Sequence, residues 1–423
     1  MKITNLVKML AVGVSGALLF ACGGGGGSSS STTVNVVTQA GVFTQGQAVF
    51  KGYSGANLDK PYVLNTVTFD ASKNGRFSAD VGNYKGVLLV EVSGEYSDEA
   101  TEQTTTVSPS APMKSAVPST SVQNGATLVV SPLTDVAAQK AAEAGNDKLT
   151  DTLVVQHNQA VSTLFGIQDI TTTVPVAPVA SDLQVSTIDT QKAYTAALLL
   201  MSQYVAEYAS AATGKPVSAL SAAELSLSLP GAVRALVSGI SVNTSAAAPV
   251  ATITSPSTAF TLQQAQTAMS ANTAMADLTA AVGSTNTATV NTAVTTTITN
   301  SGSAVQNVKK YTLKTTGTLA TGAKITGIQL VLGVPAGSIA VDTAGAPLAG
   351  VVTPVGSGFS TPIVVLEELA LRLGFLNANG VESGPFATVY ATAENAAAFT
   401  ITGVKIVDAA SGALITTLTV VIE

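Results

Sequence analysis

Few side chains in this chain of 423 residues could serve as a nucleophile, an acid–base catalyst or a metal ligand. The chain has one cysteine, Cys22, one histidine, His157, and no tryptophan. Cys22 stands between an apolar run, Met9–Ala21, and a string of glycine and serine. If its thiol is modified there, no thiolate remains for catalysis, a disulfide or metal ligation. We therefore expect no catalytic residue, no metal site and no cofactor.

His157 could act as a general base, because imidazole titrates near neutrality. It falls, however, on the apolar side of an expected helix, in register with Leu153, Ala160, Val161 and Leu164. The sequence contains no G-x-S-x-G motif that would supply a nucleophile. The pattern favours a partly buried, hydrogen-bonded structural histidine.

The segment from Asp70 to Gly75 resembles half of a calcium site. Asp70, Ser72, Asn74 and Gly75 match the first half of the loop D-x-[DN]-x-[DN]-G, with serine in the middle place. The loop needs a bidentate glutamate at its twelfth position, which is Val81 here. Tight-turn chemistry accounts for Asp, Asn and Gly without a metal. The pattern favours a turn, with calcium binding as the alternative.

Other carboxylates offer two further candidates. The acidic stretch Glu95–Glu102 could hold an ion, although loops collect charges by default and a solvated loop is the favoured interpretation. Glu367 and Glu368 are adjacent, and adjacent residues on a strand point to opposite faces, so they cannot flank one bond. A glycan hydrolase would need two carboxylates about 5–10 Å apart. Distant acids that converge on folding would meet that need.

The charge balance excludes nucleic acid as a partner. Lys and Arg number 19 against 25 Asp and Glu, which gives a formal net charge of −6. Binding to nucleic acid depends on Lys and Arg meeting phosphates. Charged residues make up only 10% of the chain, against about 25% in average soluble domains.

The first 21 residues have the pattern of a secretory signal sequence. Lys2 and Lys8 make a basic start, and the apolar run Met9–Ala21 follows. That run is short for a stable membrane span, which needs about 20 apolar residues. The alternative is a simple N-terminal anchor.

The tetrapeptide Leu19-Phe20-Ala21-Cys22 resembles the lipobox of bacterial lipoproteins. This resemblance implies a diacylglycerol thioether on the Cys22 thiol and an acyl chain on its freed amine. Two or more acyl chains hold a protein firmly on a membrane, at about 0.8 kcal/mol per buried methylene. Gly23, in place of the aspartate of inner-membrane retention, implies the outer membrane. Residues 22–33 then form a Gly/Ser-rich tether with a span of roughly 20 Å.

Composition divides the remainder into zones that predict an α+β multidomain protein. Residues 34–107, rich in Gly, Val, Tyr and Phe, predict a small β-sandwich. Residues 108–130 have the Pro/Ser/Thr composition of a linker, interrupted by one strand at 126–130. Residues 131–300 predict a helical bundle, and residues 301–423 predict a C-terminal β-sandwich.

The string FDASKNGRFSADV, followed by GVLLVEVSG, resembles the carboxypeptidase regulatory-like, transthyretin-related sandwich. Such domains carry a D-x-x-G-x-[FY] hairpin before a strand, and the spacing from Asp70 to Gly75 is one or two residues longer. The Asn74-Gly75 pair also predicts a hairpin, because both residues accept positive φ. The resemblance covers about 70 residues and implies a small Greek-key sandwich that serves as a non-catalytic accessory module.

Apolar stripes at helical spacing predict helices in the central zone. The stripe rich in tyrosine is more typical of a bundle core than of an aromatic binding face. A third stripe lies in an expected helix over 263–282, and residues 284–300 form a weak helix or a linker. The three stripes are Leu133, Val136, Ala137, Lys140 and Ala141; Tyr194, Ala197, Leu198, Met201, Tyr204, Val205 and Tyr208; and Ala268, Ala271, Met275, Leu278 and Val282.

The last zone alternates between apolar and polar residues, as strands do. Residues 328–334, 369–375 and 414–422 predict strands, and turns are expected at 377–380 and 408–412. The strings ITGIQLVLGVPAG, GPFATVYATA and FTITGVKIVDAASGALITTLTVVIE faintly resemble cohesin-like jelly-roll sandwiches. That resemblance implies a protein-binding surface.

These observations together predict a lipid-anchored cell-envelope protein of the outer membrane that displays non-catalytic binding modules. Its partners would be the membrane, through the lipid on Cys22, and a protein or a glycan. Two alternatives stay open. One is an envelope glycan hydrolase with paired carboxylates, and the other is a structural subunit of a surface layer or filament.

Overall fold

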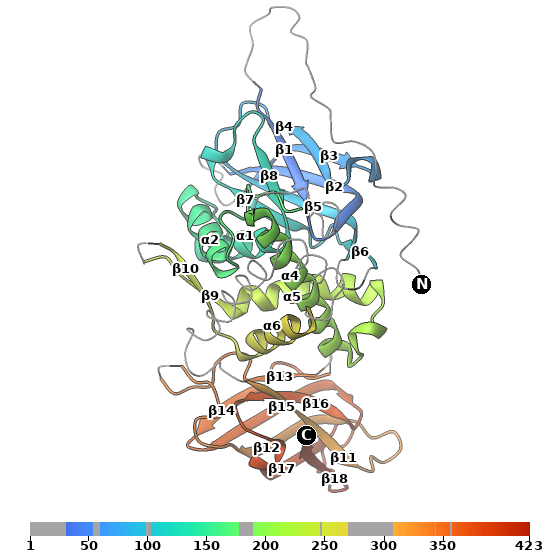
Figure 1. Ribbon diagram of the computed structural model, residues 1–423. Coiled ribbons are helices and arrows are strands. Elements are labelled where there is room, and N and C mark those ends of the chain that lie inside the picture. The colour runs from blue at the N-terminus through green and yellow to red at the C-terminus, as the bar shows by residue number, and fades with distance from the viewer. Residues whose placement is uncertain are drawn as a thin grey trace, which may run out of the picture.

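The computed structural model describes residues 31–53, 60–98, 101, 103–176, 189–245, 248–269, 308–342, 344–355 and 358–423. The expected signal sequence, Cys22 and most of the tether lie outside these residues, as do residues 270–307 of the expected helical and linker patterns. Two β-rich regions flank a helical region (Figure 1). The predicted α+β class with a central helical region is confirmed.

The N-terminal region contains two β-sheets. One has the strand order β4-β1-β8, and the other has the order β3-β2-β5-β6, with β7 also paired to β5. Aromatic rings pack between the sheets; Phe69 on β3 and Phe77 on β4 stack with their centroids 4.8 Å apart. The strands are β1 (Thr33–Thr38), β2 (Val42–Tyr53), β3 (Tyr62–Phe69), β4 (Arg76–Asp80), β5 (Val87–Ser97), β6 (Thr104–Val107), β7 (Met113–Val117) and β8 (Thr127–Val130).

The turn at Asn74-Gly75 joins the two sheets and is not the hairpin that the sequence predicts. β3 pairs with β2, whereas β4 pairs with β1. Asn74 (φ 46°) and Gly75 (φ 68°) are both left-handed, so the dipeptide does adopt the conformation that its residue types favour. The carbonyl of Gly75 accepts bonds from the backbone and hydroxyl of Thr38 on β1. These bonds draw the turn across to the second sheet.

Two strands lie in the segment 108–130, where the composition predicts a linker. β7 pairs with β5, and β8 lies parallel to β1. The strand expected at 126–130 is confirmed as β8. The prolines that suggested a linker stand between elements: Pro109 and Pro112 lie in the β6–β7 turn, and Pro118 directly follows β7. A proline between strands removes no hydrogen bond from the sheet. A segment rich in proline can therefore still contain strands, and this is why the composition wrongly predicted a linker.

The helices follow the predicted apolar stripes, and the stripe residues of α1, α2 and α4 are mostly buried. α6 begins at Pro256 rather than at Gln263. Among the described residues, no helix is long and apolar enough to cross a lipid bilayer. The helices are α1 (Pro132–Gly145), α2 (Asp151–Leu164), α4 (Asp189–Thr213), α5 (Ala222–Gly239) and α6 (Pro256–Met269); β9 (Ile240–Asn243) and β10 (Val250–Ile253) form a two-stranded ribbon between α5 and α6.

One hydrophobic core joins the N-terminal sheets to the helices. Buried residues from Val34 on β1 to Met269 on α6 belong to a single cluster. Tyr194 on α4 shows the connection at one point, since its hydroxyl lies 2.7 Å from Ser131 Oγ and donates to the carbonyl of Ile170 at 2.8 Å. Sheets and helices therefore form one packed body rather than two modules joined by a linker.

The C-terminal region is a sandwich of two four-stranded sheets, β13-β16-β11-β18 and β14-β15-β12-β17. Phe375 and Phe386 meet between the sheets, with ring centroids 5.1 Å apart. Residues 377–380, an expected turn, instead belong to β15 at a bulge against β12. The strands are β11 (Lys309–Gly317), β12 (Ile325–Gly333), β13 (Val352–Pro354), β14 (Ile363–Glu367), β15 (Ala370–Val381), β16 (Pro385–Ala391), β17 (Thr400–Asp408) and β18 (Leu418–Ile422).

Replacing Tyr194 by phenylalanine tests the contact of α4 with Ser131, the residue between β8 and α1, and with Ile170, which follows α2. Tyr194→Phe removes one hydroxyl and leaves the buried Ile170 carbonyl without that donor, so we expect the free energy of unfolding to fall by about 1–3 kcal/mol. Chemical denaturation of the full chain measures the change. Tyr208→Phe, on the same helix but half-buried, is the matched control and should cost less than about 0.5 kcal/mol. Equal effects of the two substitutions would contradict the assignment.

Candidate functional site

A cleft of ≈ 180 Å³ lies where the N-terminal sandwich meets the helices. Its walls come from the β6–β7 turn, the start of β7, the first turns of α1 and the middle of α5. The apolar part of the lining includes Pro112, Leu229, Pro230 and Val233. The polar and charged residues of the lining are Ser110, Lys114, Asp135, Gln139 and Arg234.

Side chains of two helices hold the strand edge beside the cleft. β5 pairs with one edge of β7. On the other edge, the hydroxyl of Thr134 donates to the carbonyl of Lys114 at 2.8 Å, and the carboxylate of Asp135 accepts the Lys114 N–H. Two residues along, Asn158 Nδ2 of α2 donates to the carbonyl of Ala116 at 2.9 Å. The helices therefore satisfy the backbone groups that an edge strand leaves unpaired.

The first turn of α1 places Asp135 at this edge. Ser131 caps the helix in a reciprocal capping box with Thr134, and Pro132 occupies the first turn, where its missing N–H costs nothing. Asp135 directly follows Thr134 in this first turn, and its side chain is only 6% exposed. Its oxygen Oδ1 accepts a bond from Gln139 Nε2, one turn further on, at 2.9 Å.

Charges alternate in a row that ends at Asp135. Lys51 Nζ on β2 lies 2.7 Å from Glu91 Oε2 on β5. Glu91 is the cross-strand neighbour of Lys114 on β7, and Lys114 contacts Asp135 through its backbone. Arg234 lines the cleft from α5. Two cations and one carboxylate thus line the cleft, while Glu91 is engaged with Lys51.

Burial raises the pKa of Asp135 to about 7. The hydrogen bond from Gln139 and the charge and N–H of Lys114 oppose this rise, whereas the charge of Glu91 adds to it. The loss of water around the carboxylate outweighs these bonds. Asp135 therefore changes its charge near neutral pH, where an exposed aspartate would be fully ionised.

The two cations of the cleft have no ion-pair partner in the part of the chain that the structure describes. Five salt bridges are found there, and none includes Lys114 or Arg234. Arg234 is exposed and Lys114 is half-buried. Neither side chain would have to break such a salt bridge in order to bind an anion.

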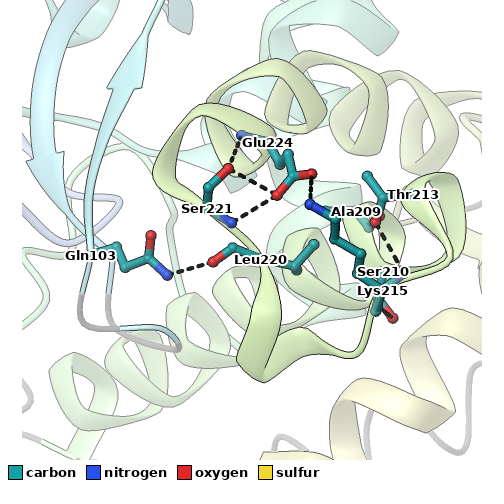
Figure 2. A network of polar contacts seen from close by, with 8 residues as sticks. All are labelled: Gln103, Ala209, Ser210, Thr213, Lys215, Leu220, Ser221 and Glu224. Carbon is teal, nitrogen blue, oxygen red and sulfur yellow. Dashed lines mark hydrogen bonds and ion pairs between the residues drawn. The ribbon is translucent and has the colours of Figure 1, made fainter.

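A network at the start of α5 fixes the helix that carries Arg234 (Figure 2). Ser221 and Glu224 form a capping box, and Glu224 also pairs with Lys215 Nζ at 2.6 Å. The bond from Lys215, followed by the bonds from Ser221, lowers the pKa of Glu224 to about 2. Gln103 Nε2 donates to the carbonyl of Leu220 at 2.8 Å and so ties this helix start to the strand region before β6.

His157 lies away from the cleft lining, on the buried side of α2. Its Nδ1 is 2.8 Å from the carbonyl of Leu153, and burial lowers its pKa. The predicted structural role, buried and hydrogen-bonded, agrees with this geometry.

The Asp70 segment has the geometry of a tight turn. Asp70 Oδ1 accepts bonds from the backbone N–H and the hydroxyl of Ser72, at 2.9 and 2.6 Å. These bonds lower the pKa of Asp70. Val81, at the place of the missing ligand, is buried. Among the described residues, no group of three or more His, Cys, Asp or Glu side chains is placed to hold a metal ion.

The remaining acidic candidates serve separate structural contacts. Asp98 is buried and is not part of a solvated loop, because it accepts bonds from Ser202 Oγ at 2.7 Å and from Thr101. Glu99 and Glu102 lie outside the described residues. Glu367 pairs with Arg372 at 2.6 Å, and Glu368 (φ 54°) stands in the turn after β14 rather than on a strand. The conclusion that the two glutamates do not act as a pair is unchanged, although its reason is the turn.

The sequence patterns identify none of the cleft residues as functional. Asp135 is covered only by the helical zone expected over residues 131–300. A local signal was present: Asp135 and Gln139 are four residues apart beside the apolar stripe of α1, as a pair that shares a buried contact would be. Arg234 carried no such signal, because only the tertiary fold brings α5 to β7.

Asparagine at position 135 tests the burial of the acid. Because the folded-state pKa lies above the unfolded value near 3.8, Asp135 stabilises the fold most at low pH and loses this contribution as the pH rises from about 4 through about 7. The loss should be on the order of 2–4 kcal/mol. Asp135→Asn removes the titration, so the free energy of unfolding of the variant should vary less between pH 4 and pH 8. Glu382→Gln, at an exposed acid, should leave the wild-type profile intact, and an unchanged profile in Asp135→Asn would show that the carboxylate is not desolvated.

No protein-family model matches this chain, and neither a curated protein nor a solved structure matches it.

Proposed function

We propose that this chain is a lipid-anchored protein of the bacterial outer membrane that displays non-catalytic binding modules to a protein or glycan partner. The resemblance of Leu19–Cys22 to a lipobox supports the anchor. The Gly/Ser string supports a flexible connection to the folded part. β1, the first described strand, begins at Thr33 and lies between β4 and β8. A tether attached to a central strand would transmit force into the middle of the sheet.

The composition of the cleft is the observation that carries the non-catalytic assignment. Its lining includes one carboxylate, Asp135, and two cations, Lys114 and Arg234. A glycan hydrolase needs a second carboxylate facing the first across the bond to be cleaved. Glu91 is near enough to influence Asp135, but it is bound to Lys51 and does not line the cleft. This arrangement favours binding over hydrolysis.

Exposed apolar side chains on the C-terminal sandwich support a protein partner. Ile363 on β14 is 65% exposed and Leu376 on β15 is 62% exposed. Ile363 stands opposite Gly374, which is two residues before Leu376 on β15, and Leu376 stands opposite Gly327 on β12. Exposed apolar groups that lie close together are typical of a surface that another protein covers.

Replacing Cys22 by serine tests the anchor. Cys22→Ser removes the only thiol, so no thioether can form and the attraction of the acyl chains to the bilayer is lost. In cell fractionation we expect most of the protein to move from the membrane pellet to the soluble fraction. Intact-mass analysis of the wild-type protein should show the added acyl mass. Gly23→Asp is the matched control and should stay membrane-bound, with a shift towards the inner-membrane fraction.

Two results would contradict the proposal. Unchanged sedimentation of Cys22→Ser with the bilayer would exclude the lipid anchor. Concentration-dependent assembly of that soluble protein into long polymers, measured by analytical ultracentrifugation, would favour the structural subunit of a surface layer instead.

A further inference from the structure

We propose that the cleft between β7, α1 and α5 binds a small carboxylate-bearing ligand with a short apolar body. Arg234 and Lys114 would bind the carboxylate, and the apolar walls would cover the body. This inference goes beyond the proposed function, because it requires neither the lipid anchor nor an envelope location.

Unpaired positive charge supports an anionic ligand. The chain as a whole is acidic, with a net charge of −6, yet two cations without ion-pair partners among the described residues line this cleft. The planar guanidinium of Arg234 can donate two parallel hydrogen bonds to a carboxylate. The ammonium of Lys114 offers a second, rotatable donor on the opposite wall.

The size and lining of the cleft limit the rest of the ligand. A volume of ≈ 180 Å³ corresponds to about six water molecules in liquid water, at about 30 Å³ each. A carboxylate with a chain of about three carbons fills that space. Pro112, Leu229, Pro230 and Val233 would cover the chain. The same residues cannot bond to the oxygens of a phosphate, which would lose water without compensation.

Asp135 would make binding depend on pH. When protonated, its carboxyl group can donate a hydrogen bond to the ligand, whereas the ionised form repels it. The charged groups around it are Lys114 from β7, Glu91 from β5 with its partner Lys51 from β2, and Arg234 from α5. Affinity for a carboxylate should therefore fall as the pH rises through neutrality.

His157 on α2 is the remaining group whose ordinary pKa lies near this range. Burial lowers its pKa, so its charge changes at more acidic pH. It does not line the cleft, and it is bound to Leu153 on its own helix. A variant at position 135 separates its contribution from that of Asp135.

Calorimetric titration of the full chain carrying Cys22→Ser tests the site without membrane or lipid. The probes are acetate, butyrate, neutral butyramide and inorganic phosphate, at pH 6. We expect butyrate to bind about tenfold more tightly than butyramide, because only butyrate can form charge-assisted bonds. Arg234→Gln should weaken butyrate about tenfold. Arg76→Gln, at an exposed arginine on β4, should leave its affinity unchanged.

The pH arm tests the role of Asp135. Between pH 5.5 and pH 8 the affinity for butyrate should fall several-fold in the parent protein and stay constant in Asp135→Asn, which keeps a neutral donor. Any of four results would overturn the inference: no saturable binding of butyrate, equal binding of butyramide, equal losses in Arg234→Gln and Arg76→Gln, or tighter binding of phosphate. Because the tested protein lacks the anchor, these outcomes are independent of whether Cys22 is acylated in cells.

Discussion

The unpaired edge of β7 is the constraint that joins the sandwich, the helices and the cleft. β5 occupies one edge of this strand, and the backbone groups of Lys114 and Ala116 face the helices. Such groups must find partners, because a buried unpaired N–H or carbonyl costs about as much as a lost hydrogen bond. Thr134, Asp135 and Asn158 provide them. Separation of the helices from the sandwich would therefore expose an unpaired strand edge. This constraint agrees with the single hydrophobic core that the sheets and the helices share.

Asp135 differs from the other two side chains that satisfy this edge. Thr134 and Asn158 are neutral, and they bond to the strand with no charge to bury. Asp135 makes an equivalent bond but loses water around its carboxylate, which works against its ionised form. A neutral residue would serve the strand edge with less penalty. Structure alone therefore favours an amide at position 135, yet the chain has an acid there. Acids whose pKa is shifted by burial are common at sites that bind charged ligands.

The sequence predicted what local patterns determine. The stripes of α1, α2 and α4 are mostly buried, as their spacing indicates. β8 and β18 lie within the expected segments, and β12 overlaps the strand expected at 328–334 but begins earlier, at Ile325. The errors come from long-range partners. The Asn74-Gly75 dipeptide has the positive φ values of a hairpin turn, yet Thr38 on a different sheet binds it. Likewise, the short segments of β7 and β8 stand between prolines, and nothing in them reveals that β5 and β1 will pair with them.

The site was less predictable than the fold, because none of its walls is local. Gln103 and Leu220 are joined by a hydrogen bond across the fold, just before the start of α5, and α5 is the helix from which Arg234 lines the cleft. No periodicity connects such residues. A second non-local contact involves Gly231, which follows Pro230 in the middle of the same helix. A Cβ on Gly231 would lie 2.9 Å from the Tyr208 hydroxyl of α4. The missing side chain leaves room for the end of the Tyr208 ring against α5. This contact joins two helices that are separate in the sequence, so the composition of neither helix reveals it.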